Sequence, residues 1–362
     1  MHPIIRPVAP VLVWLLLAFA AQSQTDSAAF QRVLDEAIAD PKLVGLSAAV
    51  SIGGMTAWSG GAGWADIENR VPETGHSVHR LASVSKSITA MAVMKLVEQK
   101  KLALEQTVRD FISDYPQEKP ITILHLLTHT SGIRHYVKPN EADGMEHYRF
   151  LRLALPIFEN DPLLFEPGTK YHYTTYGYTL LGEIAQRAGG YREFGDLMRE
   201  LIWAPAGMND TRLELVGEIV PHRVRGYSIY ADREIRNAPY TDLSYKYPGG
   251  GMLTTVEDMM RLVQAFDAGK LVSLDARGTM LTLPVLPGGE KTIYALGWRV
   301  GTNDHGFIYT HSGGQAGTTT YLACYPDAGV AVAVFSNVDG TGEQVDAVTG
   351  KLLGIAFATA KK

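Results

Sequence analysis

A serine and a lysine stand three residues apart in the segment Ser83-Val84-Ser85-Lys86. On a helix this spacing places both side chains on one face, within reach of each other. A serine hydroxyl is a weak nucleophile until a base removes its proton, and a lysine serves as that base only where burial or nearby cations lower its pKa. The pair indicates nucleophilic catalysis, but the spacing alone is weak evidence because roughly one such pair is expected by chance in a chain of this length.

The helix that must carry this pair is apolar on nearly every side. From Val84 to Val97 apolar residues fill most positions, which predicts a helix buried in the core. We expect it to begin at Ser83 and to end near Gln99, where Lys100 and Lys101 suit the carbonyl end of the helix dipole. Burial would lower the pKa of Lys86, and the free N–H groups at the helix start would support an anion at Ser83.

Two further polar segments follow in the chain. Tyr173-Thr174-Thr175 comes after the turn at Pro167-Gly168 and directly before an apolar helical pattern. His311-Ser312-Gly313-Gly314 lies on the strand that opens a C-terminal hairpin. In penicillin-binding proteins and serine β-lactamases the same Ser-x-x-Lys spacing comes first in the chain, and two more motifs follow it.

Six passages together resemble the serine β-lactamase-like superfamily of penicillin-recognising hydrolases. Within it the chain is most similar to the class C-like branch, which includes the mitochondrial serine β-lactamase-like proteins and bacterial relatives. The passages span about residues 79–337 and read LASVSKSITAMAVMKLVEQKKLAL, ILHLLTHTSGIRHY, FEPGTKYHYTTYGYTLLGEIA, GGGMLTTVEDM, ALGWRV and HSGGQAGTTTYL.

The resemblance implies a role for each matching residue. Ser83 would be the acylated nucleophile, Lys86 its proton partner, and Tyr173 the phenol or phenolate that passes the proton to the leaving group. The backbone N–H groups of Ser83 and Gly314 would form the oxyanion hole, where each preorganised donor is worth roughly 3–4 kcal/mol. Gly313 and Gly314 suit a backbone that approaches a substrate closely, and an edge strand there could pair with an extended substrate.

Two of the substrate-binding positions depart from the lactamase pattern. Thr175 stands where the second motif usually ends in Asn, and one hydroxyl cannot hold a substrate amide on two sides. His311 stands where the third motif usually begins with Lys, and near neutral pH we expect it to be a partial cation at most. We therefore expect weak or no β-lactamase activity, and weaker activity on anionic substrates as pH rises through the titration of His311.

The order of strand-like and helical segments predicts a mixed α/β (α+β) fold, with a mainly antiparallel sheet flanked by helices and a large helical insertion. Short apolar runs around Gly53-Gly54 predict an N-terminal hairpin over residues 46–58. Strand-like runs at 308–310, 318–324 and 329–337 and a closing helix at about 344–360 follow. We expect one catalytic unit over residues 24–362, its α/β part at about 27–101 and 241–362 and its helical part at about 102–240.

Composition excludes several classes of function. Among 362 residues there are 33 Lys and Arg against 38 Asp and Glu, a net charge of −5 without long single-sign runs, so nucleic acid is not an expected partner. The single cysteine, Cys324, excludes an intrachain disulfide and a cysteine-rich zinc site, and we expect it to be a small apolar filler in a strand. His125 and His129 stand four apart, but no Glu accompanies them as in a zinc hydrolase, so we expect packing and capping.

The N-terminus resembles a secretory signal. Arg6 precedes an apolar run of about 14 residues, Val8 to Ala21, which is shorter than a membrane span of roughly 20 residues. We expect residues 1–23 to be a signal peptide and the protein to be periplasmic or secreted, with an uncleaved anchor as the alternative. No later run is apolar enough to cross a bilayer.

These observations predict a serine hydrolase that cleaves amide or ester bonds through an acyl-enzyme at Ser83 and needs no metal or organic cofactor. We expect a peptidase or esterase whose partner is a small-molecule or peptide substrate. The alternative is a catalytically vestigial protein of the same fold that binds partners or assembles into a homo-oligomer or filament. The intact set of Ser83, Lys86 and Tyr173 argues against that alternative.

Overall fold

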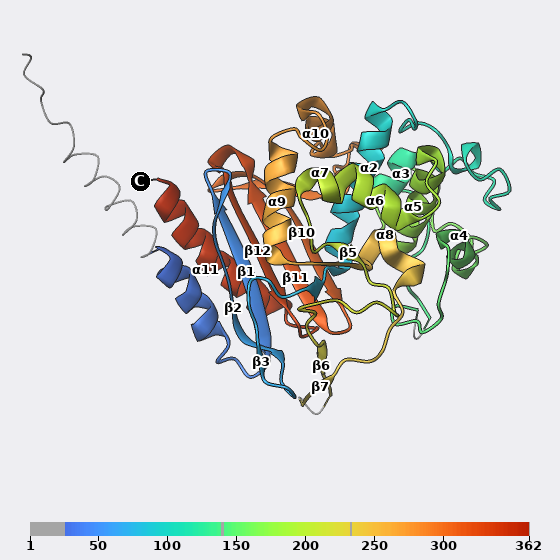
Figure 1. Cartoon of the computed structure of the whole chain (residues 1–362). Coiled ribbons are helices and arrows are strands. Elements are labelled where there is room, and N and C mark those ends of the chain that lie inside the picture. The colour runs from blue at the N-terminus through green and yellow to red at the C-terminus, as the bar shows by residue number, and fades with distance from the viewer. Residues whose placement is uncertain (1–25, 139–140, 232–233, 362) are drawn as a thin grey trace, which may run out of the picture.

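A seven-stranded antiparallel sheet forms one half of the molecule. The computed structural model describes residues 26–138, 141–231 and 234–361. The strand order is β3-β2-β1-β12-β11-β10-β9, and every neighbouring pair is antiparallel (Figure 1). The strands are β1 (Gly45–Ile52), β2 (Met55–Asp66), β3 (Val71–Pro72), β9 (Arg299–Asn303), β10 (Gly306–Gln315), β11 (Thr318–Tyr325) and β12 (Val330–Ser336).

Both ends of the chain contribute to this sheet. Gly53 and Gly54 adopt φ angles of 61° and 74°, which glycine tolerates without strain, and they close the expected β1–β2 hairpin. β1 pairs with β12, so the first strand lies beside the last. The expected C-terminal strands are confirmed, β10 being longer than expected, and the closing helix α11 (Gly342–Ala360) begins two residues before its expected start.

One face of the sheet is covered by helices from the two ends of the chain. α11 contacts β1, β11 and β12, and a helix over residues 26–37 lies beside it (Figure 1). Phe30, Leu34, Leu352 and Phe357 are buried in one apolar cluster with the strands. Both helices bury an apolar side against the sheet, and this packing fixes the N- and C-terminal segments on the same face.

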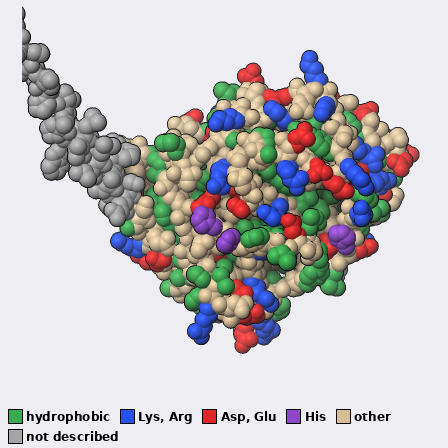
Figure 2. All heavy atoms as spheres, in the orientation of Figure 1, with side chains coloured by type: hydrophobic (Ala, Val, Ile, Leu, Met, Phe, Trp, Pro, Cys, Tyr) green, Lys and Arg blue, Asp and Glu red, His purple; other side chains and the backbone are tan. Residues whose placement is uncertain are grey.

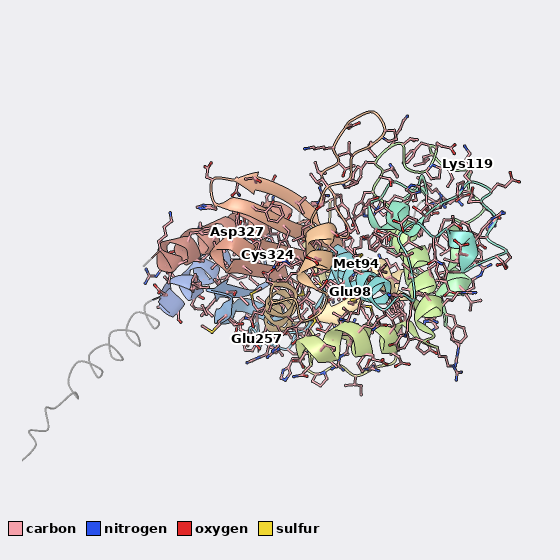
Figure 3. The ribbon with its side chains drawn as sticks, turned by 90° about the horizontal axis from the view of Figure 1, so that it is seen from above. Met94, Glu98, Lys119, Glu257, Cys324 and Asp327 are labelled. Atoms are coloured by element: carbon pink, nitrogen blue, oxygen red, sulfur yellow. The ribbon has the colours of Figure 1, made fainter. Side chains whose placement is uncertain are left out.

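The opposite face carries the helical half of the molecule. α9 (Val256–Asp267) packs against β1, β2 and β12, and the larger apolar core lies beyond it. Seen from above, α2 with Met94 and Glu98 lies in the middle of the molecule, beside the part that carries Cys324 (Figure 3). Besides α9, the helices of this half are α2 (Ser85–Glu98), α3 (Ile123–Leu127), α4 (Leu151–Ala154), α5 (Thr175–Gly189), α6 (Phe194–Met198), α7 (Ala204–Ala206), α8 (Tyr247–Gly250) and α10 (Leu274–Met280).

Some short elements were not expected from the sequence. Within residues 102–240, which were expected to be mostly helical, lie the strands β5 (Arg212–Leu213), β6 (Tyr227–Ile229) and β7 (Ile235–Asn237). β5 and β4 (His79–Arg80) both pair with β8 (Met252–Thr254), which forms a second, three-stranded sheet. Short 3-10 turns complete the path: η1 (Ala82–Val84), η2 (Val108–Asp110), η3 (Leu155–Ile157), η5 (Ser244–Lys246) and η6 (Pro326–Ala328), with a π-helical turn η4 (Arg199–Trp203).

Three sequence-based expectations concern the charge of the surface, membrane-spanning helices and the signal peptide. On the face shown in Figure 2, basic and acidic side chains are interspersed over the surface. Within the described residues no helix combines the length and the apolar character needed to span a bilayer. The expected signal peptide, residues 1–23, lies outside the described residues.

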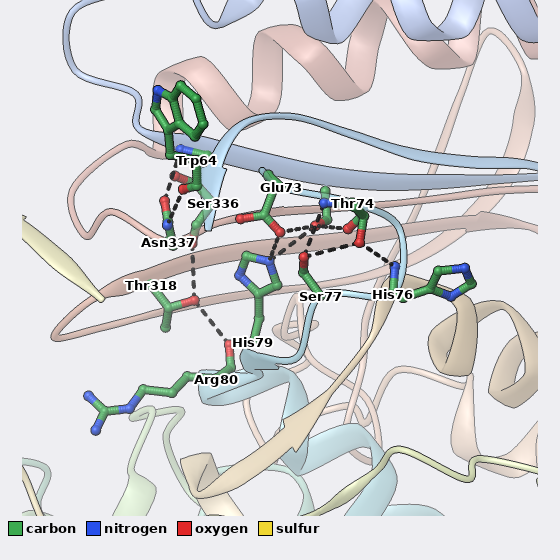
Figure 4. Close-up of polar contacts among 12 residues, drawn as sticks. Trp64, Glu73, Thr74, His76, Ser77, His79, Arg80, Thr318, Ser336 and Asn337 are labelled. Carbon is green, nitrogen blue, oxygen red and sulfur yellow. Dashed lines mark hydrogen bonds and ion pairs between the residues drawn. The ribbon is translucent and has the colours of Figure 1, made fainter. Parts of the chain in front are cut away.

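A buried polar network fastens the first strands to the last ones (Figure 4). The Ser47 hydroxyl on β1 donates to the Glu73 carboxylate (2.8 Å), and Nε2 of His79 on β4 lies 3.1 Å from the same carboxylate oxygen. The Thr318 hydroxyl on β11 lies 3.0 Å from the carbonyl oxygen of Arg80. These bonds hold β4 against the sheet, and β4 leads directly to Ser83.

Candidate active site

Ser83 lies in a sharp turn between β4 and α2. The 3-10 turn η1 spans Ala82–Val84, and α2 begins at Ser85, so the expected helix start at Ser83 is two residues too early. Ala82 has a φ angle of 49°, a left-handed conformation that costs energy for a residue with a Cβ atom. Because η1 continues directly into α2, Ser83 still presents its side chain on the same side as Lys86.

The expected pairing of Ser83 and Lys86 is present in the structure. Lys86 Nζ lies 3.1 Å from Ser83 Oγ and donates to the carbonyl oxygen of Gly249 at 2.6 Å. Burial, together with the positive charge of Lys246, lowers the pKa of Lys86 well below its ordinary value. This environment therefore favours the neutral amine of Lys86, which is the form that can accept the proton of Ser83.

Tyr173 lies against both members of the pair. Lys86 Nζ lies 4.9 Å from the centre of its ring, and Ser83 is close enough to its phenol to influence the pKa of Tyr173. Burial raises the pKa of Tyr173 above its ordinary value, which the interaction with Ser83 only partly offsets. Of the two forms expected for Tyr173, this environment favours the phenol, which leaves Lys86 as the base.

The third motif, His311-Ser312-Gly313-Gly314, lies on β10 and places an edge of that strand beside the site. β9 pairs with β10 only from Gly306 to Thr310, so the following residues of β10 have no β9 partner. A Cβ atom on Gly313 would lie 2.3 Å from Thr320 Oγ1 and 2.7 Å from the carbonyl oxygen of Leu81, so glycine is required for β10 to approach the turn that carries Ser83. Gly314 lines the same cavity as Ser83, while the side chain of Ser312 is exposed.

His311 does not face the cavity as a cation. Its Nδ1 donates to the carbonyl oxygen of Ser312 (2.7 Å), so Nε2 accepts from the Tyr294 hydroxyl (2.9 Å) in the neutral ring. Burial, and secondarily the charge of Lys86, lowers the pKa of His311 to about 3. A neutral His311 agrees with the expectation of a partial cation at most near neutral pH, and the lowered pKa moves the expected pH dependence of activity on anionic substrates to acidic pH.

Thr175 lies on the cavity wall, as its place in the second motif suggests. It is the first residue of α5, it is buried, and its backbone N–H donates to His135 Nδ1 (3.3 Å). Tyr136 lies on the same cavity wall. The Thr175 side chain ends in a single hydroxyl and offers a substrate less than an amide would.

Several cavity residues were missed from the sequence, among them Lys246 and Gln315. The cavity has a volume of about 280 Å³ and includes Lys246 and Gln315 in its lining together with Ser83, Thr175 and Gly314. Only two residues separate Lys246 from the Gly249-Gly250-Gly251 run, and Gln315 follows Gly314 directly. Their adjacency to glycine-rich segments at the site is the signal that points to both.

His125 and His129, whose spacing resembles that of metal ligands, both accept hydrogen bonds from the backbone. His125 Nδ1 accepts from the Thr122 backbone N–H in a capping box at the start of α3. His129 is buried, with its ring centre 4.2 Å from that of Tyr173, and its Nδ1 accepts from the Thr174 backbone N–H. Over the described ranges no group of three or more histidine, cysteine or acidic side chains is arranged to hold a metal ion.

Comparisons with known proteins agree with this geometry. A family model described as Beta-lactamase matches residues 30–354. The bovine (Bos taurus) mitochondrial serine beta-lactamase-like protein LACTB is 28% identical over 90% of this chain and 78% of its own. Esterase EstB of Burkholderia gladioli is 29% identical over 69% of this chain and 72% of its own.

A solved structure supports the same relationship. The crystal structure of a penicillin-binding protein from Bacillus halodurans superposes with a TM-score of 0.76 at 28% identity, covering 88% of this chain and 98% of that one. The family model spans nearly all of the described fold, including the turn at Ser83, the start of α5 and the end of β10. The chain therefore belongs to the β-lactamase family.

Proposed function

We propose that this protein is a serine hydrolase that cleaves ester or amide bonds through an acyl-enzyme at Ser83. The observation that carries the proposal is the 3.1 Å contact between Ser83 Oγ and Lys86 Nζ at the wall of a cavity, with the pKa of Lys86 lowered by burial. Lys86 accepts the serine proton while Ser83 Oγ bonds to the substrate carbonyl carbon. The oxyanion formed is stabilised by the backbone N–H groups of Ser83 and Gly314.

The leaving group then departs with a proton. The proton held by Lys86 reaches the ester oxygen or amide nitrogen through the phenol of Tyr173, whose ring centre lies 4.9 Å from Lys86 Nζ. The C–O or C–N bond breaks and leaves the acyl group on Ser83. Water attacks this ester by the reverse proton route, which releases the acid and restores the free serine.

We further propose that esters and peptides are better substrates than β-lactams. Thr175 carries a hydroxyl in place of an amide, and His311 is neutral and contacts the Tyr294 hydroxyl, so neither supplies the amide or the cation of the lactamase pattern. A relative named as an esterase supports the ester class. Hydrolysis of p-nitrophenyl butyrate, D-amino-acid peptides and nitrocefin under identical conditions compares the three.

The nucleophile is tested by covalent labelling. We expect a fluorescent fluorophosphonate to label the wild-type protein, and Ser83→Ala to abolish both labelling and hydrolysis of p-nitrophenyl butyrate. Ser85→Ala is the matched control, because the Ser85 hydroxyl is buried and has no hydrogen-bond partner among the described residues. Labelling that survives Ser83→Ala would overturn the assignment. A wild-type protein that is neither labelled nor active, but forms polymers under the electron microscope, would support the vestigial alternative instead.

A further inference from the structure

Lys246 is a buried cation without an anionic partner in the described part of the chain. It is only 3% exposed, and its Nζ donates to the carbonyl oxygen of Ala142 at 2.8 Å. An ammonium group has three donors, and no carboxylate among the described residues lies within ion-pair distance of it. Burying a charge is costly unless the charge is paired, so this lysine is suited to an anion that arrives from outside.

Gln315 supplies a second unused donor on the same wall. Its Nε2 atom is buried and has no hydrogen-bond partner among the described residues. A Cβ atom on Gly250 would lie 3.4 Å from Gln315 Oε1 and 3.8 Å from Lys246 Cδ, so the two side chains flank Gly250. All three residues line the cavity that contains Ser83.

The other charged groups around Lys246 leave its charge available. Arg80 and Glu214 form an ion pair with each other at 2.7 Å. Asp143 also lines the cavity, but it is exposed, so water screens its charge. These three groups act on Lys246 in opposite directions, and burial lowers its pKa to about 8, which leaves it mostly protonated at neutral pH.

We infer that Lys246 and Gln315 form a carboxylate-binding subsite, and that the preferred substrates are esters or amides that carry a second, free carboxylate. This inference rests on the proposed hydrolysis at Ser83 and names its substrate class. The ammonium of Lys246 and the amide N–H of Gln315 donate to the two carboxylate oxygens over Gly250, while the scissile carbonyl lies at Ser83. The cation of the cavity is therefore Lys246, which directly precedes α8, and not His311, which is neutral and contacts Tyr294.

The test compares matched pairs of substrates that differ only in a free carboxylate. One series is the mono-p-nitrophenyl esters of adipic and pimelic acid, each against its methyl-capped diester. The other is 3-butanoyloxybenzoate against its methyl ester, which places the carboxylate on the leaving group. We expect the wild-type protein to favour the carboxylate member of at least one pair by about 10–100-fold in kcat/KM, the scale of a hydrogen-bonded charge.

Variants assign the preference to the two residues. Lys246→Met should bring that ratio close to one, Lys246→Arg should keep part of it, and Gln315→Leu should lower it about 2–10-fold. The ratio is the readout because a change in the reactivity of Ser83 affects both members of a pair equally. Lys270→Met, at an exposed lysine after α9, is the control for the loss of one positive charge.

Each outcome decides the inference. A wild-type ratio near one in every pair, or a ratio that Lys246→Met leaves unchanged, would overturn it while the hydrolase assignment stands. A different result would contradict the proposed function itself: the Ser83→Ala variant would still hydrolyse the neutral esters.

Discussion

One buried lysine of the site, Lys246, acts on another, Lys86. Both side chains are almost fully buried, and the positive charge of Lys246 adds to burial in lowering the pKa of Lys86. Protonated Lys86 cannot accept the proton of Ser83, so activity rises with pH as Lys86 becomes neutral. Lys246 therefore extends the activity of the protein toward lower pH, in addition to any contact it makes with a substrate.

Replacing Lys246 should move the pH profile in a defined direction. Lys246→Met keeps the site buried but removes the neighbouring charge, so the pKa of Lys86 should rise and the ascending limb of kcat/KM for p-nitrophenyl butyrate should shift to higher pH. The shift should be on the order of one pH unit, the scale of one nearby like charge. Lys246→Arg keeps the charge and should keep the wild-type limb. An unchanged or downward-shifted limb in Lys246→Met would show that Lys246 does not act on Lys86.

The residues of the site differ in how far the sequence predicts them. Ser83 and Lys86 were predictable because their spacing and the apolar helix that buries them are local features of one segment. The full burial of His311, which keeps it neutral, was not, because it depends on how the folded chain packs around the ring, with the Tyr294 hydroxyl 2.9 Å from Nε2. Lys246 was missed for the same reason, since its burial comes from Ala142 and other residues far away in sequence.

At the level of elements, β10 must lie very close to the turn that carries Ser83. Gly313 allows this approach, because any Cβ atom there would overlap Thr320 and the Leu81 carbonyl. We expect Gly313→Ala to lower the free energy of unfolding by about 1–3 kcal/mol, the usual cost of overpacking, and to lower kcat at least 10-fold by moving the oxyanion donors.

The matched control for this change lies on the neighbouring strand. A methyl group added at Gly301 on β9 would have only Ile308 Cγ2, at 4.0 Å, within contact, so Gly301→Ala should be tolerated in both measurements. Urea unfolding and ester hydrolysis measure the two effects. Equal activity of both alanine variants would mean that the close approach of β10 is not needed for the site.

The longer elements were predictable and the shortest ones were not. The β1–β2 hairpin, β10 to β12 and α11 have runs of apolar residues and glycine turns that define them locally. β4 and β5 contain two residues each, too few to show any periodicity, and they form only because both pair with β8. Yet β4 is the strand that positions Ser83, so the exact geometry of the nucleophile depends on contacts that sequence patterns do not contain.

At the scale of the whole molecule, the site requires segments from both halves of the chain. Ser83 follows β4, Tyr173 precedes α5, Lys246 precedes α8 and Gly314 lies on β10. The network of Figure 4 fixes β4 to the large sheet through the fully buried carboxylate of Glu73. The stability of that carboxylate therefore bears on the whole arrangement.

Glu73 should make the stability of the fold depend on pH. Burial alone would raise its pKa, but the charge and hydrogen bond of His79 and the hydrogen bonds of Ser77 and Ser47 hold the pKa below its ordinary value. A carboxyl whose pKa is lower in the folded than in the unfolded state stabilises the fold above the unfolded value, and this contribution is lost as pH falls through the folded value. The free energy of unfolding should therefore decrease as the pH falls below about 4.5.

Glu73→Gln should remove this dependence. At pH 7 the variant should be less stable by about 1–3 kcal/mol, because a charged acceptor is lost from buried donors. Between pH 5 and pH 3 its free energy of unfolding, measured with urea by tryptophan fluorescence, should fall less than that of the wild-type protein. Glu36→Gln, at an exposed residue of the helix over residues 26–37, is the control and should follow the wild-type curve. Parallel curves for Glu73→Gln and the wild-type protein would show that the Glu73 carboxylate does not hold β4, and with it the turn at Ser83, against the sheet.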